Sequence, residues 1–198
     1  MENNNIQNKE NTPLKTKKGV EGFWELVKFA LIAIIIVIPI RMFIAQPFVV
    51  SGESMFPTFN NGEYLIVDEI SYRLGNLHRG DVVVFRYPND TKRFFIKRII
   101  GMPNEEIEIK NGIVTVINKE NPEGFKLDEP YIDEPFDTTL SSVTGDDEYF
   151  VLGDNRNRSS DSRVWGTVSN KLMMGRVYLR LFPFKEMSYL PGYYKEIK

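Results

Sequence analysis

The stretch that decides the fold is Arg93-Phe94-Phe95-Ile96-Lys97-Arg98-Ile99-Ile100-Gly101-Met102-Pro103. It is rich in β-branched and aromatic residues and ends at a glycine and a proline, which is typical of a β-strand. Because side chains alternate along a strand, we expect Lys97 to share a face with Phe95 and Ile99, while Arg98 points to the other face and keeps its charge. The chain is therefore predicted to be mainly β, with similar strand-like runs at residues 64–67, 81–85, 149–152 and 177–181.

A β-hairpin is predicted immediately after this stretch. Residues 106–110 and 113–116 alternate apolar and polar side chains and flank Asn111-Gly112, a strong signal for a two-residue turn. Residues 118–147 are acidic, contain three prolines and show little apolar patterning. We expect them to form a long loop, within a short inserted region of about residues 104–148.

A candidate membrane anchor precedes the β region. The uncharged apolar run at residues 29–40 is bounded by Lys28 and Arg41, which are thirteen positions apart. This separation is about 20 Å along a helix, but both charged side chains can extend towards the interface and Trp24 can lie within it. A helix over roughly residues 24–44 is therefore expected to cross a bilayer.

The anchor, at residues 23–45, is expected to be retained. A cleaved leader and a soluble helix are the alternatives, but Ala45 is followed directly by Gln46-Pro47, and no good Ala-x-Ala cleavage site is present. The polar, lysine-containing tail at residues 1–22 favours a cytoplasmic N-terminus. We therefore expect a single-pass protein of the cell membrane whose residues 46–198 lie outside the cytoplasm.

The composition excludes several classes of function. The chain of 198 residues has no cysteine, which rules out a disulfide framework and thiol catalysis. A net charge of -2 gives no reason to expect nucleic acid as a partner. The single histidine, His78, lies beside Arg79 in a polar turn where both are expected at the surface, so a Ser-His-Asp triad is not favoured. No metal-binding cluster or phosphate-binding loop is visible, and we expect no cofactor and no metal.

Ser54 is the candidate nucleophile, and it lies within residues 51–58. Gly52 and Pro57 bend and stiffen the backbone around it. A serine hydroxyl needs a neighbouring base to remove its proton. Lys97, placed between large apolar side chains, would lose hydration, and acting as a base near pH 7–8 requires a pKa about 2–3 units below roughly 10.4. The alternatives are an ordinary glycine-serine loop and a lysine that faces solvent.

Residues 153–163 form a third segment that carries chemistry. Asp161 and Arg163 lie two positions apart and can form an ion pair. The hydroxyl of Ser159 or Ser160 can accept a hydrogen bond from the lysine amine and orient it. Taken alone, such a segment is a solvated loop in most proteins.

Together these segments resemble the type I signal peptidase family, in its Gram-positive style. The resemblance covers about residues 25–182, behind the anchor, and implies a serine endopeptidase that uses a Ser/Lys dyad, with Ser54 as nucleophile and Lys97 as general base. The matching motifs occur in the family's order: Ser54-Met55-Phe56-Pro57-Thr58, Arg79-Gly80-Asp81-Val82-Val83-Val84-Phe85, Lys97-Arg98-Ile99-Ile100-Gly101-Met102-Pro103, and Gly153-Asp154-Asn155-Arg156 with Ser159, Asp161, Ser162 and Arg163.

The resemblance also implies roles and partners. Ser159 corresponds to the serine that orients the lysine, and Asp161 with Arg163 to a supporting ion pair. The implied fold is an antiparallel β catalytic domain of the signal peptidase type. It lies on the outer surface of the cell membrane, in contact with lipid. The implied substrates are the signal peptides of exported preproteins, cut after small residues at the first and third positions before the scissile bond.

Two features depart from the family pattern. Some members carry a serine two residues before the nucleophile that helps to form the oxyanion hole, whereas this chain has Gly52 there and Ser51 one step further back. The hole would need the Ser54 amide together with either the Gly52 backbone or the Ser51 hydroxyl. The segment between Pro103 and Gly153 is short compared with the long second domain of Gram-negative members, which implies that this domain is reduced here to a hairpin and a loop.

Two other functions are alternatives to the endopeptidase. A catalytically silent, membrane-anchored β domain acting as a binding or assembly module would be expected to lose Ser54 or Lys97, and both are present. A self-cleaving Ser/Lys protease of the repressor type would be expected to carry a DNA-binding helical domain instead of an anchor.

Overall fold

The structure is a computed structural model that describes residues 18–39, 45–69 and 77–194. The chain divides into two compact units, residues 1–40 and residues 41–198, and each is described by itself.

The described part of the first unit is helix α1, Lys18–Pro39. The helix predicted over roughly residues 24–44 begins earlier than expected, because residues 18–22 are already helical. Ala45, the last residue of the predicted anchor, begins a strand. Residues 40–44 of the predicted anchor lie outside the described residues.

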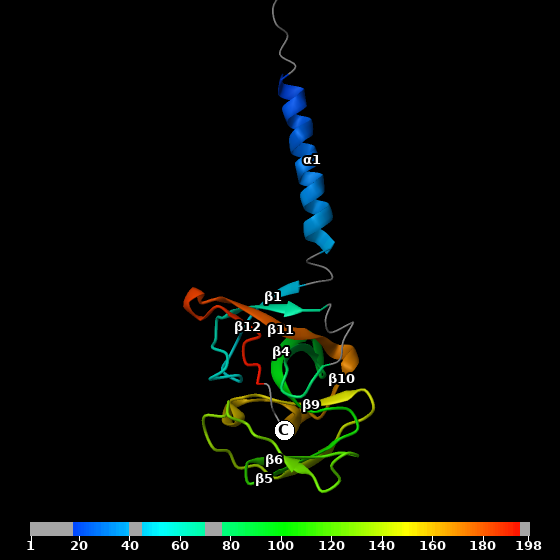
Figure 1. Ribbon diagram of the computed structural model, residues 1–198, viewed down its shortest axis with the longest axis vertical. Coiled ribbons are helices and arrows are strands. Elements are labelled where there is room, and N and C mark those ends of the chain that lie inside the picture. The colour runs from blue at the N-terminus through cyan, green and yellow to red at the C-terminus, as the bar shows by residue number, and fades with distance from the viewer. Residues whose placement is uncertain (1–17, 40–44, 70–76, 195–198) are drawn as a thin grey trace, which may run out of the picture. The chain divides into compact units, whose positions relative to one another are not determined.

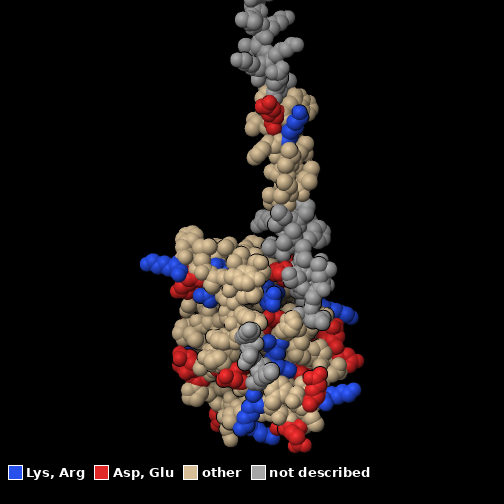
Figure 2. Space-filling model, viewed as in Figure 1, with Lys and Arg blue, Asp and Glu red and all other residues tan. Residues whose placement is uncertain are grey.

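Helix α1 exposes apolar side chains along most of its length. Leu26, Phe29 and Ile35 are each more than 60% exposed, and Figure 2 shows the charged side chains of this helix gathered near one end. Among the described residues, however, no helix combines the length and the hydrophobicity that a membrane crossing requires.

The second unit contains two antiparallel sheets. The strands of the larger sheet are β1 Ala45–Val49, β2 Tyr64–Asp68, β3 Val82–Tyr87, β4 Asp90–Gly101, β9 Glu148–Leu152, β10 Val168–Ser169, β11 Met173–Phe182 and β12 Ser188–Tyr189. Their order is β1-β2-β11-β3-β4-β9-β10, with β12 paired to β11 (Figure 1). Short helical turns connect the later strands: η2 Arg156–Arg158, α3 Ser162–Trp165, η3 Asn170–Leu172 and η4 Phe184–Glu186.

The smaller sheet lies at the opposite end of this unit from β1 and β12 (Figure 1). Its strands are β5 Glu106–Lys110, β6 Ile113–Ile117, β7 Phe125–Lys126 and β8 Leu140–Val143, in the order β7-β6-β5-β8. The predicted hairpin is confirmed, and Asn111 and Gly112 both have positive φ angles, of 50° and 76°, as a tight two-residue turn requires.

The predicted long loop at residues 118–147 is wrong in part, as is the reduction of the second domain to a hairpin and a loop. Strands β7 and β8 fall within these residues and pair with the two outer edges of the hairpin. Both strands are short and carry only partly buried or exposed side chains, so they leave little apolar alternation in the sequence.

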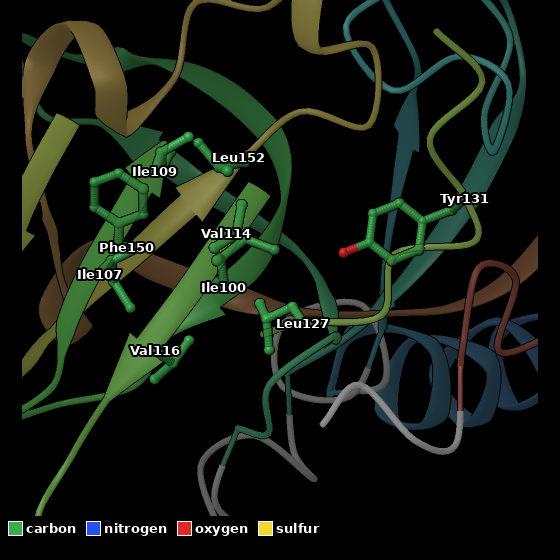
Figure 3. Close-up of a cluster of buried hydrophobic side chains, with 9 residues drawn as sticks. All are labelled: Ile100, Ile107, Ile109, Val114, Val116, Leu127, Tyr131, Phe150 and Leu152. Atoms are coloured by element: carbon green, nitrogen blue, oxygen red, sulfur yellow. The ribbon is translucent and has the colours of Figure 1, made fainter. Parts of the chain in front are cut away.

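A shared apolar core joins the two sheets. Figure 3 shows Ile100 of β4 and Phe150 of β9 among side chains from β5 and β6. Gly101 makes this approach possible, because a Cβ atom there would lie 2.8 Å from the Ile107 side chain and 2.9 Å from Phe150. The core therefore fixes the end of β4, the strand that also carries Lys97.

The turn at residues 78–81 agrees with the sequence only in part. His78 is at the surface as expected, with its side chain 74% exposed. The expectation that Arg79 is a surface residue is wrong, because its guanidinium makes two hydrogen bonds to the buried carboxylate of Glu105, at 2.7 and 2.8 Å. A partner this distant in the sequence leaves no trace in the local pattern.

Candidate active site

Ser54 lies on a turn that is anchored in the core from both sides. We call residues 50–59 the nucleophile loop. Its Met55 and Phe59 side chains are fully buried, and the Phe59 amide donates to the Met55 carbonyl at 2.9 Å. Ser54 itself is half-buried. Because buried apolar side chains hold the loop, the serine hydroxyl is presented from a rigid backbone.

Lys97 reaches Ser54 from the middle of strand β4. Its Nζ donates hydrogen bonds to Ser54 Oγ at 2.7 Å and to the Ile96 carbonyl at 2.8 Å. The residue is 3% exposed, and its amine lies 5.3 Å from the centre of the Phe95 ring. Burial and the shared face with Phe95 agree with the prediction from strand alternation.

The surroundings of Lys97 favour the neutral amine. Burial lowers its pKa from 10.5 to about 8, although the carboxylates of Asp161 and Asp154 act in the opposite direction. A buried ammonium group loses its hydration, and two more distant carboxylates restore only part of that free energy. A substantial fraction of the lysine is therefore unprotonated at mildly alkaline pH.

We call residues 153–163 the catalytic loop, and Asp161 closes it. The buried carboxylate of Asp161 accepts hydrogen bonds from the Gly153 amide at 3.1 Å and from Nε of Arg163 at 2.8 Å. The predicted Asp161–Arg163 ion pair is thus present. The loop is joined to the nucleophile loop by the Asn155 amide, which donates to the Ser54 carbonyl at 3.1 Å.

Ser159 packs against Gly153 inside this loop. A Cβ atom at Gly153 would lie only 2.2 Å from Ser159 Oγ and 2.4 Å from the Ser54 carbonyl oxygen. The Ser159 hydroxyl is buried and has no hydrogen-bond partner among the described residues. Its predicted role in orienting Lys97 stays a prediction.

The two candidate oxyanion donors differ in their contacts. The Gly52 amide already donates to Oδ1 of Asn61 at 2.9 Å, and Gly52 has a φ angle of 93°. Ser51 has an exposed side chain and lines the same cavity as Ser54 and Lys97. The geometry therefore leaves the Ser51 hydroxyl freer than the Gly52 amide to meet a reacting oxygen.

A cavity of about 470 Å³ opens beside the serine and the lysine. Besides Ser51, Ser54, Lys97, Arg93 and Ser160, its lining is apolar and comes from β1, β2, β3 and β4 and the residue after β1: Phe48, Val49, Val50, Leu65, Val84, Phe94, Phe95 and Ile96. Such a cavity can receive apolar side chains of a bound peptide.

A buried ion pair that the sequence did not predict lies on the other face of β4. Arg98 is fully buried, and its Nε and Nη2 donate to the two carboxylate oxygens of Asp154 at 2.8 and 2.5 Å. Burial lowers the pKa of Arg98, but the adjacent Asp154 outweighs it and leaves the pKa raised. Thr58 of the nucleophile loop donates to Asp154 at 2.5 Å. The prediction that Arg98 points away from Lys97 is confirmed. The sequence indicated a partner for Arg98 only because a charged side chain on a buried strand has to be paired.

A segment between the hairpin and strand β8 also reaches the catalytic loop. We call residues 127–136 the strap. Its Glu129 carboxylate forms a buried, two-pronged ion pair with Arg156, whose Nε donates to the Gly153 carbonyl at 3.1 Å. The ring of Tyr131 lies 3.9 Å from the guanidinium carbon of Arg98. No pattern in the acidic sequence of the strap indicated these contacts.

In the ranges that the structure describes, no group of three or more His, Asp or Glu side chains is arranged to hold a metal ion. The expectation that the chain needs no cofactor stays a prediction.

Comparisons with known proteins agree on one family. The chain is 40% identical over 187 residues to "Probable signal peptidase I-2" of Synechocystis sp., covering 90% of this chain and 83% of that protein. It is 36% identical over 194 residues to signal peptidase I of Bacillus caldolyticus, covering 90% and 98% of the two chains. It is 34% identical over 177 residues to signal peptidase IB of Staphylococcus aureus, covering 80% and 88%.

The family described as "Signal peptidase, peptidase S26" matches residues 23–182. This range contains the nucleophile loop, strand β4 and the catalytic loop, which together bring Ser54 and Lys97 into contact. The match spans most of the chain, and the relatives are more than 30% identical along most of their length. The chain therefore belongs to the signal peptidase family, peptidase S26, whose signal peptidase I members are serine endopeptidases.

Proposed function

We propose that this protein is a membrane-bound endopeptidase that removes signal peptides from exported preproteins, with Ser54 as nucleophile and Lys97 as general base. The observation that carries the proposal is the 2.7 Å hydrogen bond between Lys97 Nζ and Ser54 Oγ, made by a lysine that is 3% exposed. A base within hydrogen-bond reach and with a pKa near the working pH is what activation of a serine requires.

In the proposed reaction, neutral Lys97 takes the proton of Ser54 as Oγ attacks the scissile carbonyl. The Ser54 amide and the Ser51 hydroxyl stabilise the oxyanion that forms. The lysine then gives its proton to the leaving amine, and a water molecule hydrolyses the acyl-enzyme by the same route. In this proposal Asp161 and Arg163 hold the catalytic loop in place, and Ser159 orients the lysine.

The apolar cavity beside the dyad supports cleavage after small residues. Its walls at Val50, Leu65 and Val84 are formed by buried side chains that cannot withdraw without disturbing the core. We infer that a larger side chain directed at these walls would be rejected sterically.

We further propose that residues 23–45 attach the chain to membrane lipid, with the N-terminus in the cytoplasm and residues 46–198 outside it. The exposed apolar side chains of helix α1 support this, because large apolar surfaces are seldom left in water.

The direct test is cleavage, in detergent, of a purified preprotein with an Ala-x-Ala site. We expect the wild-type protein to cut once, after that site, and Ser54→Ala to be inactive although folded. A serine-directed acylating inhibitor should attach to Ser54, as read by peptide mass spectrometry. A folded wild type that neither cuts nor is labelled would instead favour the silent binding module.

The rate of cleavage is expected to depend on the protonation of Lys97. With a pKa of about 8, the neutral fraction rises about tenfold per pH unit below pH 8 and levels off above it, a rise of about 50-fold between pH 6 and pH 8. Measuring kcat/KM over this range at constant ionic strength checks the expectation. A profile that is flat from mildly acidic to mildly alkaline pH would contradict the role of Lys97.

Replacing Gly153 with alanine is expected to lower kcat by about 100-fold. The new Cβ would stand 2.4 Å from the Ser54 carbonyl oxygen, so the backbone that carries the nucleophile has to move. Gly145→Ala is the matched control, because its nearest contact is the flexible Glu148 side chain at 3.3 Å. Equal activities of the two variants would show that the Gly153 contact does not position Ser54.

A further inference from the structure

A second cavity, of about 250 Å³, lies beside the first and has no part in the mechanism above. Glu53 and Phe56 of the nucleophile loop, Asn155 and Arg158 of the catalytic loop, and Asp133 and Glu134 of the strap contribute to its lining. The structure thus brings three separate segments of the chain to one hollow next to the reactive serine.

The two cavities are lined by different residues of the same two loops, and we call the contact between these loops the seam. The first is lined by Ser51, Ser54 and Ser160, whereas the second uses other residues of these loops, and no residue lines both. The seam is held by the 3.1 Å hydrogen bond from the Asn155 amide to the Ser54 carbonyl. An ion pair between Arg158 and Glu53, at 2.8 Å, adds a second contact across it.

This arrangement suits a peptide that is cut at the seam. If the residues before the scissile bond occupy the first cavity and the carbonyl lies at Ser54, the residues after the bond must leave on the other side. The second cavity is next to Ser54, because it is lined by Glu53, which precedes Ser54 in the sequence, and by Asn155, whose amide binds the Ser54 carbonyl.

The wall of the second cavity contributed by the strap is held in place. Arg156, whose side chain is fully buried, binds Glu129 at the start of the strap. At the other end, the Asn157 side chain donates to Glu134 at 3.3 Å and to the Pro135 carbonyl at 3.1 Å. The cavity is therefore built from fixed parts, as a binding subsite requires.

The charges in this cavity do not cancel. Asp154 is paired with Arg98, Arg156 with Glu129, and Glu53 with Arg158. The two remaining carboxylates, of Asp133 and Glu134, are exposed and form no ion pair with any cation in the part of the chain that the structure describes. A side chain entering this hollow meets a negative potential.

We propose that the second cavity binds the segment on the carboxyl side of the scissile bond, the start of the mature protein, and that Asp133 and Glu134 favour a basic side chain there. This inference rests on the proposed endopeptidase function. Because both carboxylates are exposed and screened by salt, the preference for Lys over Glu is expected to be about 3- to 10-fold in kcat/KM.

The test uses the full-length protein in detergent and matched preproteins with one signal peptide and one Ala-x-Ala site. The substrates carry Lys, Gln or Glu at one of the first four positions after the bond. We expect the Lys/Glu ratio of kcat/KM to exceed 3 at one position at least, to approach 1 in Asp133→Asn/Glu134→Gln, and to invert in Asp133→Lys/Glu134→Lys.

The control is Glu123→Gln/Asp146→Asn, which removes the same formal charge from exposed positions outside both cavities and should keep the wild-type ratio. A wild-type ratio near 1 at all four positions, or a ratio that the Asp133 and Glu134 changes leave intact, would overturn the subsite while leaving the endopeptidase standing. Failure of the wild type to cut any substrate would overturn the proposed function, and the subsite with it.

Discussion

Replacing Lys97 with methionine is expected to abolish preprotein cleavage, by at least about a thousandfold, while making the protein more stable at neutral pH. The loss of activity follows from removing the base that lies 2.7 Å from Ser54 Oγ. The gain in stability follows from the burial of the amine, which lowers its pKa from 10.5 to about 8. Methionine fills a similar volume without a charge to desolvate.

The sign and the pH range of the stability effect follow from proton linkage. Between about pH 8 and pH 10.5 the unfolded chain binds more protons at this lysine than the folded protein does, so wild-type stability rises with pH in that range. Below pH 8 the protonated, buried amine costs about 3 kcal/mol. Lys97→Met removes this penalty, so its advantage should be largest below pH 8 and vanish above pH 10.5.

Urea unfolding of both proteins at pH 7 and at pH 10.5, with cleavage assays alongside, checks both halves of this prediction. Lys92→Met, an exposed lysine on the same strand, should change neither stability nor activity appreciably. A Lys97→Met protein that still cleaves would mean that the base is another group. One that is inactive but destabilised at every pH would mean that the buried lysine is structural.

Replacing Asp154 with alanine is expected to lower the free energy of unfolding by about 3–5 kcal/mol. The change leaves the guanidinium of Arg98, which is fully buried, without its carboxylate partner. It also removes the acceptor of the Thr58 hydroxyl, and so loosens the nucleophile loop. We expect cleavage to fall together with stability, because this pair connects β4, the nucleophile loop and the catalytic loop.

Chemical denaturation of the single and double variants measures this effect. Arg98→Met/Asp154→Leu should recover much of the lost stability, because the uncompensated charge is gone. The exposed pair supplies the contrast: Arg158→Ala, which breaks the ion pair with Glu53, should cost less than about 1 kcal/mol. If Asp154→Ala were as mild as Arg158→Ala, the buried pair would not be a structural element of the site.

Much of the β-structure could be predicted from local patterns. The alternation of side chains around Lys97 predicted the strand, the burial of the lysine and the opposite direction of Arg98. Asn111-Gly112 predicted the hairpin turn. These features could be predicted because each depends on residues one or two positions away. Strands β7 and β8 were missed, since an edge strand of two to four half-exposed residues has no such alternation.

The sequence predicted individual residues of the candidate site but not the contacts that hold them in place. Ser54, Lys97, Asp161 and Arg163 could be named because their spacing matches a family pattern, and the ion pair between the last two spans only two positions. The partners of Arg98 and Arg156 could not be named, because Asp154 and Glu129 lie 56 and 27 residues away from them in the sequence.

The sequence by itself determined where the longer strands lie and which serine and lysine are available for catalysis. It also determined that neither a cysteine nor a triad histidine in a suitable position is present. Only the tertiary structure decided that Lys97 meets Ser54 across 43 residues, that burial brings its pKa to about 8, and that the strap closes a second cavity beside the serine. The physical reason is that strand patterns arise from adjacent residues, whereas a pKa and a cavity arise from side chains that the topology of the sheets brings together.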